Sequence, residues 1–211
     1  MSLSLVIIIL TGLISFKAFD DPVLKANLMF RPVNIRNGEY YRFFTSGLIH
    51  ADFNHLFFNM FALYIFGGLV EDLFYIRLFG ELWGRVAFIL FYFSAVALAS
   101  LPSYFRHQDN YAYSALGASG ATSALLFIFV MYLPWHWFIF PPLPGILIGV
   151  GYLWYSSYMD KRGVDNIGHN AHLWGAIYGI VFIIVASLIF DRSLLMEMIA
   201  AFLRGPSMPV W

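Results

Sequence analysis

Charged residues are scarce in this chain, and cysteine is missing altogether. Only 11% of its 211 residues are charged, whereas soluble domains carry about 25% charged residues. The 12 basic and 12 acidic residues balance to a net charge of zero, so nothing predicts a nucleic-acid partner. Without cysteine, the chain can form no disulfide, no thiolate nucleophile and no Cys-ligated zinc or iron–sulfur centre.

The chain is rich in apolar residues instead. Hydrophobic residues make up 61% of the sequence, and the mean hydropathy is +0.74. A chain of this length is most simply one domain, here residues 1–211. Because apolar runs of helix length suit the interior of a bilayer, we predict an all-α membrane protein.

Six apolar segments predict six membrane-spanning helices. The first segment has no basic residue before it and no small-x-small site behind it, which distinguishes it from a signal peptide. Prolines between residues 134 and 144 separate the fourth segment from the fifth. The predicted helices cover approximately residues 2–16, 54–74, 82–101, 117–133, 145–158 and 169–190.

Two connecting segments and the tail carry predictions of their own. Residues 20–47 form the longest non-spanning stretch, and they combine charged side chains with many aromatic rings. Aromatic rings favour the membrane–water interface, so we expect this first loop to be interfacial. Residues 103–114 are predicted to form a polar loop, and the apolar patch 194–203 predicts an interfacial helix in the tail.

The distribution of lysine and arginine bears on the orientation in the membrane. With six helices, both termini lie on one side, which holds the basic residues Arg77, Arg85, Arg192 and Arg204. The opposite side holds Lys17, Lys25, Arg31, Arg36, Arg42, Arg106, Lys161 and Arg162. Since cytoplasmic loops are enriched in basic residues, this distribution alone favours termini outside the cytoplasm.

Strongly polar side chains inside a spanning segment are costly, so each one calls for a reason. His55 and Asn59 are four residues apart and share one face of the second predicted helix. They could bridge helices through backbone carbonyls, or they could offer two hydrogen-bond donors to one spot in the core. His50 precedes that helix, and we interpret it as a residue that fixes the loop.

A single hydroxyl stands at the start of the fourth predicted helix, in the sequence Leu116-Gly117-Ala118-Ser119-Gly120-Ala121. A lone Ser at such a place is most often a helix cap or a packing contact. Here the small neighbours Gly117 and Gly120 offer a surface that another helix can approach closely.

The start of the sixth predicted helix offers a matching surface. His172 is followed by Gly175 and Gly179, a spacing that lets helices pack closely. Packing the two small-residue surfaces together would bring Ser119 within hydrogen-bond reach of His172, which is the requirement for a base-activated nucleophile. No acidic residue is placed to act as a third member, so the sequence predicts a Ser–His dyad.

Five motifs occur in an order that resembles one known family. They are Tyr41-Arg42; His50 with His55 and Asn59; Gly67-Gly68-Leu69-Val70-Glu71; Gly117-Ala118-Ser119-Gly120; and His172 with Gly175 and Gly179. Over about Tyr41 to Gly179 the chain resembles the rhomboid intramembrane serine proteases. Each motif alone is weak, but five in order on the expected helices form a specific signal. The resemblance implies a six-transmembrane-helix rhomboid-like bundle whose motif-bearing core covers about residues 41–190.

The resemblance also implies roles for individual residues. Ser119 would be the nucleophile and His172 the general base, while His55 and Asn59 would stabilise the oxyanion. The supporting residues would be His50, Arg42, Glu71, Gly117, Gly120, Gly175 and Gly179. One departure is Ser123, which stands where many family members have an aromatic ring stacked on the catalytic histidine.

The function implied by this resemblance is hydrolysis of peptide bonds in or near the transmembrane helices of membrane-protein substrates, within the lipid bilayer. It implies no metal and no cofactor. The family's topology places a multi-pass chain in the cell (inner) membrane with both termini in the cytoplasm. That orientation is opposite to the one favoured by the basic residues, and we adopt the family's. The sequence predicts no oligomeric state.

Three alternatives stay open. A catalytically inactive rhomboid-like protein could bind membrane clients without cutting them, although such relatives usually lack the Ser or the His. A membrane electron carrier could ligate haem through His55 and His172, or through His50 and His169, which would leave Ser119 without a role. A transporter is less favoured, because the sequence shows no repeat of broken helices.

Overall fold

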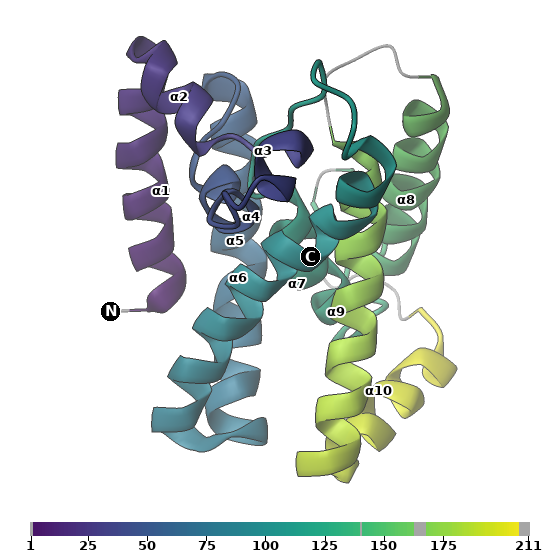
Figure 1. The fold of residues 1–211 in the computed structure, drawn as a ribbon. Helices are drawn as coiled ribbons and strands as arrows, with labels where there is room; N and C mark the ends of the chain where they lie inside the picture. The colour runs from purple at the N-terminus through teal and green to yellow at the C-terminus, as the bar shows by residue number, and fades with distance from the viewer. Residues whose placement is uncertain (1, 140, 163–167, 207–211) are drawn as a thin grey trace.

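The protein is a bundle of helices with a cap of short helices at one end (Figure 1). The computed structural model describes residues 2–139, 141–162 and 168–206, without the side chains of residues 160–162 and 169. Among these residues the only β-structure consists of two isolated bridges. In chain order the elements are α1 (Leu3–Asp20), α2 (Pro22–Leu28), α3 (Pro32–Arg36), α4 (Arg42–Thr45), η1 (Ser46–Leu48), α5 (Phe53–Asp72), the π-helix η2 (Leu73–Leu78), α6 (Gly80–His107), α7 (Ser119–Tyr132), α8 (Gly145–Arg162), α9 (His169–Phe190) and α10 (Arg192–Arg204).

Six of these helices occupy the six predicted segments, which confirms the all-α membrane bundle. Within the described residues, four helical stretches are long and apolar enough to cross a bilayer: α1, α5 together with η2, α6, and α9 from residue 170 onward. Helix α7 is apolar but has only 14 residues. At about 1.5 Å per residue it is about 21 Å long, which is shorter than a hydrocarbon core of about 30 Å.

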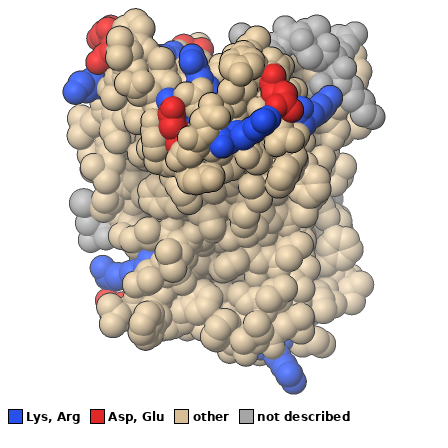
Figure 2. Space-filling view, viewed as in Figure 1, with Lys and Arg blue, Asp and Glu red and all other residues tan. Residues whose placement is uncertain are grey.

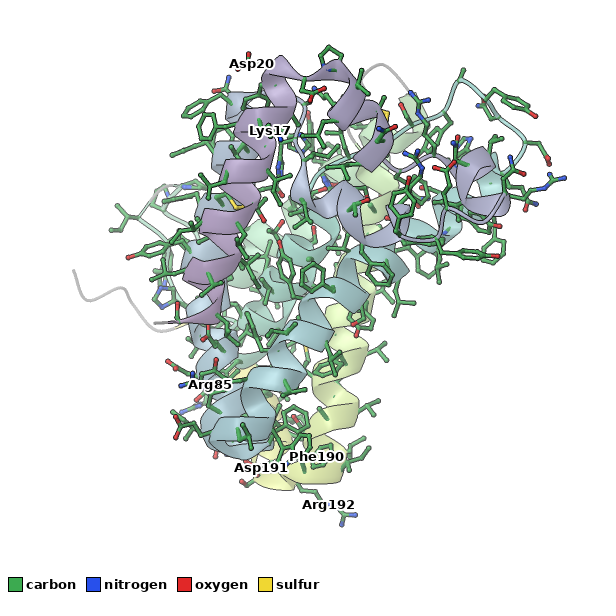
Figure 3. The ribbon with its side chains drawn as sticks, turned by 60° about the vertical axis from the view of Figure 1, so that its left-hand side comes forward. Lys17, Asp20, Arg85, Phe190, Asp191 and Arg192 are labelled. Carbon is green, nitrogen blue, oxygen red and sulfur yellow. The ribbon has the colours of Figure 1, made fainter. Side chains whose placement is uncertain are left out.

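Charged side chains gather at the two ends of the bundle. In Figure 2 most of them lie on the end formed by the cap, a few lie towards the opposite end, and the broad band between is uncharged. Figure 3 places Lys17 and Asp20 at one end and Arg85, Asp191 and Arg192 at the other. An uncharged band between two charged ends is the pattern expected of a membrane-spanning bundle.

The first loop folds into the cap, which consists of α2, α3, α4 and η1. Arg42 is only 4% exposed and donates hydrogen bonds to the carbonyls of Ala26 (2.8 Å) and Met29 (2.9 Å). It also donates to Glu39 at 2.6 Å. Hydrogen bonds from Asn34 and Arg42 lower the pKa of Glu39 below its usual value. Arg42 therefore stabilises the cap from inside.

The cap is fastened to the segment that leads into α7. Phe30 and Ala115 exchange two backbone hydrogen bonds, of 2.9 and 3.0 Å. The backbone N–H of Gly117 donates to the carbonyl of Ser46 at 2.9 Å. These bonds fix the start of α7 relative to the cap.

Glu71 joins the end of α5 to the start of α1. The residue is 2% exposed, and its carboxylate accepts the backbone N–H groups of Leu3 (2.6 Å) and Ser4 (3.0 Å) and the hydroxyl of Tyr75 (2.5 Å). The first N–H groups of a helix lack partners within the helix and carry partial positive charge. A buried carboxylate is therefore stabilised at this position.

The predicted end of the third helix at Leu101 is wrong, because α6 continues through Pro102 to His107. Proline removes one backbone hydrogen bond from a helix. A contact from outside compensates, since the Tyr104 ring packs on Phe43 of the cap with 5.6 Å between centroids. The polar loop therefore begins only after His107.

The predicted tail helix is present as α10. It buries Leu194 and Met198 against the bundle, while most of its other apolar side chains are exposed or half-exposed. Arg77 of η2 holds it through ion pairs with Asp191 (2.8 Å) and Glu197 (3.0 Å). The helix is confirmed, and its interfacial position stays a prediction.

Candidate active site

The start of α7 is shaped by a turn that favours glycine. Gly117 has a φ of +114°, a backbone conformation that other residues rarely adopt. A Cβ at this position would lie 2.6 Å from Cε1 and 2.8 Å from Nε2 of His55. The turn therefore starts α7 at Ser119 rather than at the predicted Gly117, and it lets the His55 ring lie directly against the backbone before Ser119.

A cavity of about 1040 Å³ lies beside this turn. Its walls come from α5, α7, α8 and α9 and from residues 112–116. Asp52 and Ser114, both exposed, also line it, so the cavity reaches the polar end of the bundle. The structure brings all four predicted catalytic residues to this cavity, namely Ser119, His172, His55 and Asn59.

Helices α7 and α9 meet backbone against backbone. A Cβ on Gly175 would lie 2.1 Å from the carbonyl oxygen of Gly120, and one on Gly179 would lie 2.3 Å from that of Ala124. No side chain fits at these distances, so the observed helix separation requires both glycines. Gly120 is constrained on another side too, because its Cβ would lie 2.6 Å from Cβ of Ala99 in α6. This approach brings the starts of α7 and α9 to one wall of the cavity.

His172 is 9% exposed and contacts two residues of α8. Its Nδ1 shares a hydrogen bond of 3.2 Å with Ser156 Oγ, and its ring stacks on Tyr152 with centroids 5.3 Å apart and 23° between the planes. A hydrogen bond between Ser119 Oγ and His172 is not among those formed within the described residues, so the dyad stays a prediction. The side chain of His169 lies outside the described residues.

His55 turns its Nε2 towards the start of α7. The backbone N–H of Ala51 donates to Nδ1 at 3.4 Å, so the proton of the neutral ring belongs on Nε2. Asp52 caps α5 by accepting the backbone N–H of His55 at 2.8 Å, which fixes the position of the ring. His55 is thus placed to donate a hydrogen bond into the cavity next to Ser119.

Asn59 bridges α5 and α7. Its Nδ2 donates to the carbonyl of His55 at 2.9 Å, and its Oδ1 accepts a hydrogen bond from Thr122 Oγ1 at 3.2 Å. The residue is 6% exposed and lines the cavity. Because an amide nitrogen carries two hydrogens, a second N–H is available beyond the bond to His55. Asn59 therefore does bridge two helices, and its role as an oxyanion donor stays a prediction.

His50 is fully buried and links three segments. Its Nε2 accepts the backbone N–H of Ala118 at 3.3 Å, so Nδ1 carries the proton and donates to Ser15 Oγ at 3.0 Å. Ser15 Oγ in turn donates to the carbonyl of Leu48 at 3.1 Å. Burial lowers the pKa of His50 to about 3, which keeps the ring neutral. His50 thus ties α1 and the cap to the residue before Ser119.

Sequence reasoning missed the α8 side of the site. Tyr152 and Ser156 are four residues apart and share one face of α8. Polar side chains at helical spacing in an apolar helix were the signal that could have found them. Thr122, which also lines the cavity, was missed as well. Arg42 and Glu71 do not line the cavity, and they act in the cap and at the junction of α1 with α5.

Comparison with known proteins assigns the chain to a family. A sequence model of the Rhomboid domain matches residues 37–189, well over half of the chain. The chain belongs to the rhomboid family. The matched region nearly coincides with the motif-bearing core predicted at about residues 41–190, so the predicted family is confirmed.

Three rhomboid relatives show how far the similarity extends. RHOMBOID-like protein 12, mitochondrial, of Arabidopsis thaliana is 28% identical over 174 residues, which cover 77% of this chain and 51% of that protein. Rhomboid-like protein 11, chloroplastic, of the same plant is 30% identical over 162 residues, covering 68% and 51%. The protein named "Putative rhomboid protease YdcA" of Bacillus subtilis is 28% identical over 98 residues, covering 46% and 44%. The chain thus spans about half the length of these rhomboid relatives.

Proposed function

We propose that this rhomboid-family membrane protein is an intramembrane serine endopeptidase that uses Ser119 and His172. One observation carries the proposal: both side chains line one cavity at the starts of α7 and α9, where glycines bring the two backbones together. A hydroxyl and an imidazole that share a cavity are the parts of a base-activated nucleophile. Family membership supports the same activity.

The proposed reaction hydrolyses a peptide bond in or near a transmembrane helix of a membrane-protein substrate. Ser119 Oγ attacks the carbonyl carbon while Nε2 of His172 takes its proton, and His172 then gives that proton to the leaving amine. Water, activated by the same base, hydrolyses the acyl-enzyme and restores Ser119. This sequence of steps requires neither a metal nor a cofactor.

The oxyanion formed in both steps needs hydrogen-bond donors. The candidates are Nε2 of His55, the second N–H of Asn59 and the backbone N–H of Ser119. Removing one such donor typically costs about 2.7–4 kcal/mol of transition-state stabilisation. The Asn59 amide is already held by its hydrogen bonds to His55 of α5 and Thr122 of α7. It is therefore oriented before substrate binds, which favours Asn59 as an oxyanion donor.

Water and a helical substrate reach the cavity from different directions. Asp52 and Ser114 line the polar mouth, through which water can enter. Phe58 also lines the cavity and is 67% exposed, so the cavity extends to the lipid-facing surface of α5. A helical substrate must unwind locally to present a carbonyl. Substrate segments with Gly or Pro near the membrane surface therefore fit best.

The membrane setting is part of the proposal. We place the chain in the cell inner membrane with its termini in the cytoplasm, although the basic residues favour the opposite orientation. Ion pairs at both ends of the bundle involve arginine, for example Arg36 with Asp109 and Arg77 with Asp191. A terminal fusion to a compartment-sensitive reporter distinguishes the two orientations.

Cleavage of a transmembrane substrate in liposomes tests the proposed function. Wild-type protein is expected to release product, Ser119→Ala none, and Ser187→Ala the wild-type amount. Ser187 is the matched control because it is a fully buried serine on α9 that does not line the cavity. His172→Ala should also be inactive, whereas His169→Ala should keep substantial activity. Full cleavage by Ser119→Ala would remove the nucleophile assignment.

The cleavage assay and an absorption spectrum distinguish the alternatives. An inactive client-binding protein would retain the substrate without any product that depends on Ser119. For a haem carrier, His50 is a poor ligand, since both its ring nitrogens already form hydrogen bonds. A Soret band in the purified protein would nevertheless support that alternative over proteolysis.

A further inference from the structure

A histidine that acts as a general base must be held in one orientation and one tautomer. To take a proton from Ser119, Nε2 of His172 must be unprotonated, so Nδ1 must carry the ring proton. In Ser–His–Asp hydrolases a third residue on Nδ1 performs this task. In this protein the described residue on Nδ1 is Ser156, not a carboxylate.

We propose that α8 positions His172, with Ser156 fixing the Nδ1 tautomer and Tyr152 fixing the plane of the ring, while Ser123 of α7 braces Tyr152. Because it concerns the base of the proposed protease, this inference rests on the proposed function. All three are positioning residues, since they act on the substrate only through His172.

Ser156 lies behind the imidazole, away from the substrate. It is 0% exposed and does not line the cavity, whereas His172 does. In the productive state Nδ1–H donates to Ser156 Oγ across the observed 3.2 Å. A hydrogen bond shielded from water holds its partners firmly, because water does not compete for either group. When Nε2 of His172 takes the proton of Ser119, the Nδ1 proton stays on His172 and keeps its hydrogen bond to Ser156 Oγ, so only the Nε2 proton moves on to the leaving amine.

Tyr152 holds the ring from its face. The two rings are nearly parallel, at 23° and 5.3 Å between centroids, which limits rotation of the imidazole out of plane. The Tyr152 hydroxyl shares a hydrogen bond of 2.7 Å with Ser123 Oγ, and Ser123 is 2% exposed. The aromatic ring is thus anchored to α7 one turn beyond Ser119.

The origin of this ring explains the departure noted at Ser123. Where the family resemblance leads one to expect an aromatic side chain on α7, the small Ser123 leaves space, and the ring comes from α8 instead. Helix α8 lies close enough to supply it, because a Cβ on Gly149 would lie 3.3 Å from Cζ of Phe127 in α7. Tyr152 and Ser156 occupy successive turns of α8, so one helix supplies both constraints on His172.

The first test replaces the hydroxyl on Nδ1. Ser156→Ala is expected to lower kcat about 10-fold, the size expected for one neutral hydrogen bond, with unchanged KM and melting temperature. Ser156→Thr keeps the hydroxyl and should recover most of the lost kcat. Ser157→Ala is the matched control and should match wild type, because the next position on an α-helix is turned by about 100° from Ser156. All variants are measured with one transmembrane substrate in liposomes.

The second test separates the effect of the Tyr152 ring from the effect of its hydrogen bond to Ser123. Tyr152→Leu removes the stacked ring and should lower kcat more than Tyr152→Phe, which removes only the bond to Ser123. Ser123→Ala should match Tyr152→Phe, and the double variant should be no worse than either single one, because both break the same hydrogen bond.

The outcomes distinguish this inference from the proposed function. If wild type cleaves while Ser156→Ala and Tyr152→Leu keep full kcat, the positioning role is wrong and the proposed protease stands. If Ser156→Ala and Ser156→Thr both lose melting temperature and activity in step, Ser156 is structural only, which also overturns the inference. If wild type does not cleave, both the proposed function and the inference fail.

Discussion

Helix α7 has two unlike sides. Towards α9 it presents Gly120 and Ala124, whose carbonyls lie where a Cβ on the facing glycines would stand. Towards the cavity it presents three hydroxyl residues at positions 119, 122 and 123, a spacing that puts them on one face. One side is therefore backbone against backbone, and the other carries every polar side chain of the helix apart from Tyr132 at its end.

The difference shows how one apolar helix can combine close packing with a row of hydroxyl groups. On the α9 side, separation is set by atoms that cannot change rotamer, so the relative positions of the two helix starts are fixed. On the cavity side, two of the three hydroxyls are oriented by partners on other helices: Thr122 bonds to Asn59 and Ser123 to Tyr152. Packing and chemistry thus occupy separate faces of the same 14 residues.

Replacing Asn59 tests the polar groups on the cavity side of α7. Asn59→Ala should lower kcat roughly 10- to 1,000-fold with a smaller change in KM, because an oxyanion donor acts mainly in the transition state. Thr122→Val breaks the same bridge between α5 and α7 but keeps the amide, so it should lower kcat less than Asn59→Ala does. kcat, KM and melting temperature are measured on one preparation. Equal losses of melting temperature in both variants, with unchanged kcat, would mean that Asn59 only bridges helices.

Adding a methyl group at Gly175 tests the close backbone contact between α7 and α9. In Gly175→Ala the new Cβ meets the carbonyl of Gly120, so the helices must separate. Overpacking costs about 1–3 kcal/mol of stability, and a displacement of about 1 Å at the site can cost about 100-fold in activity. Melting temperature and cleavage rate provide the measurement.

Gly151→Ala is the control for that substitution. Gly151 is also a helical glycine, on α8, but a Cβ there would meet nothing within 4 Å. It should leave both stability and activity close to wild type. Equal effects of the two substitutions would show that the backbone contact between α7 and α9 does not determine the positions of the site residues.

Acidification tests His50, which links α1 and the cap to the residue before Ser119. The pKa of His50 is lowered to about 3 by burial, against about 6.5 in an unfolded chain. Between these values the unfolded state binds the extra proton, so stability is complete above about pH 6.5 and falls as the pH drops towards 3. The slope should be at most about 1.4 kcal/mol per pH unit. Melting temperatures between pH 7 and pH 4 should decline less in His50→Gln than in wild type, and identical slopes would contradict the account.

The six helices of the bundle and the glycine contact between α7 and α9 could be predicted because both have simple sequence signals. Apolar runs mark the helices, and the spacing of Gly175 and Gly179 marks a close approach. The polar spacing of Tyr152 and Ser156 marks one face of α8, but it does not predict that Tyr152 stacks on His172, since that contact depends on how α8 rotates against α9. Nor did the sequence reveal that α6 passes through Pro102, because the contact that stabilises the next turn comes from the distant cap.

Covalent labelling tests most directly whether the cavity side of α7 carries an activated nucleophile. A fluorophosphonate probe forms a stable bond to an activated serine oxygen and releases fluoride. Incubated with the wild-type protein in detergent and mapped by mass spectrometry, it should modify Ser119. Labelling should disappear in Ser119→Ala and fall strongly in His172→Ala, while Ser187→Ala labels like wild type. An unlabelled wild type, or equal labelling of the Ser119→Ala variant, would mean that Ser119 is not the nucleophile of a serine protease.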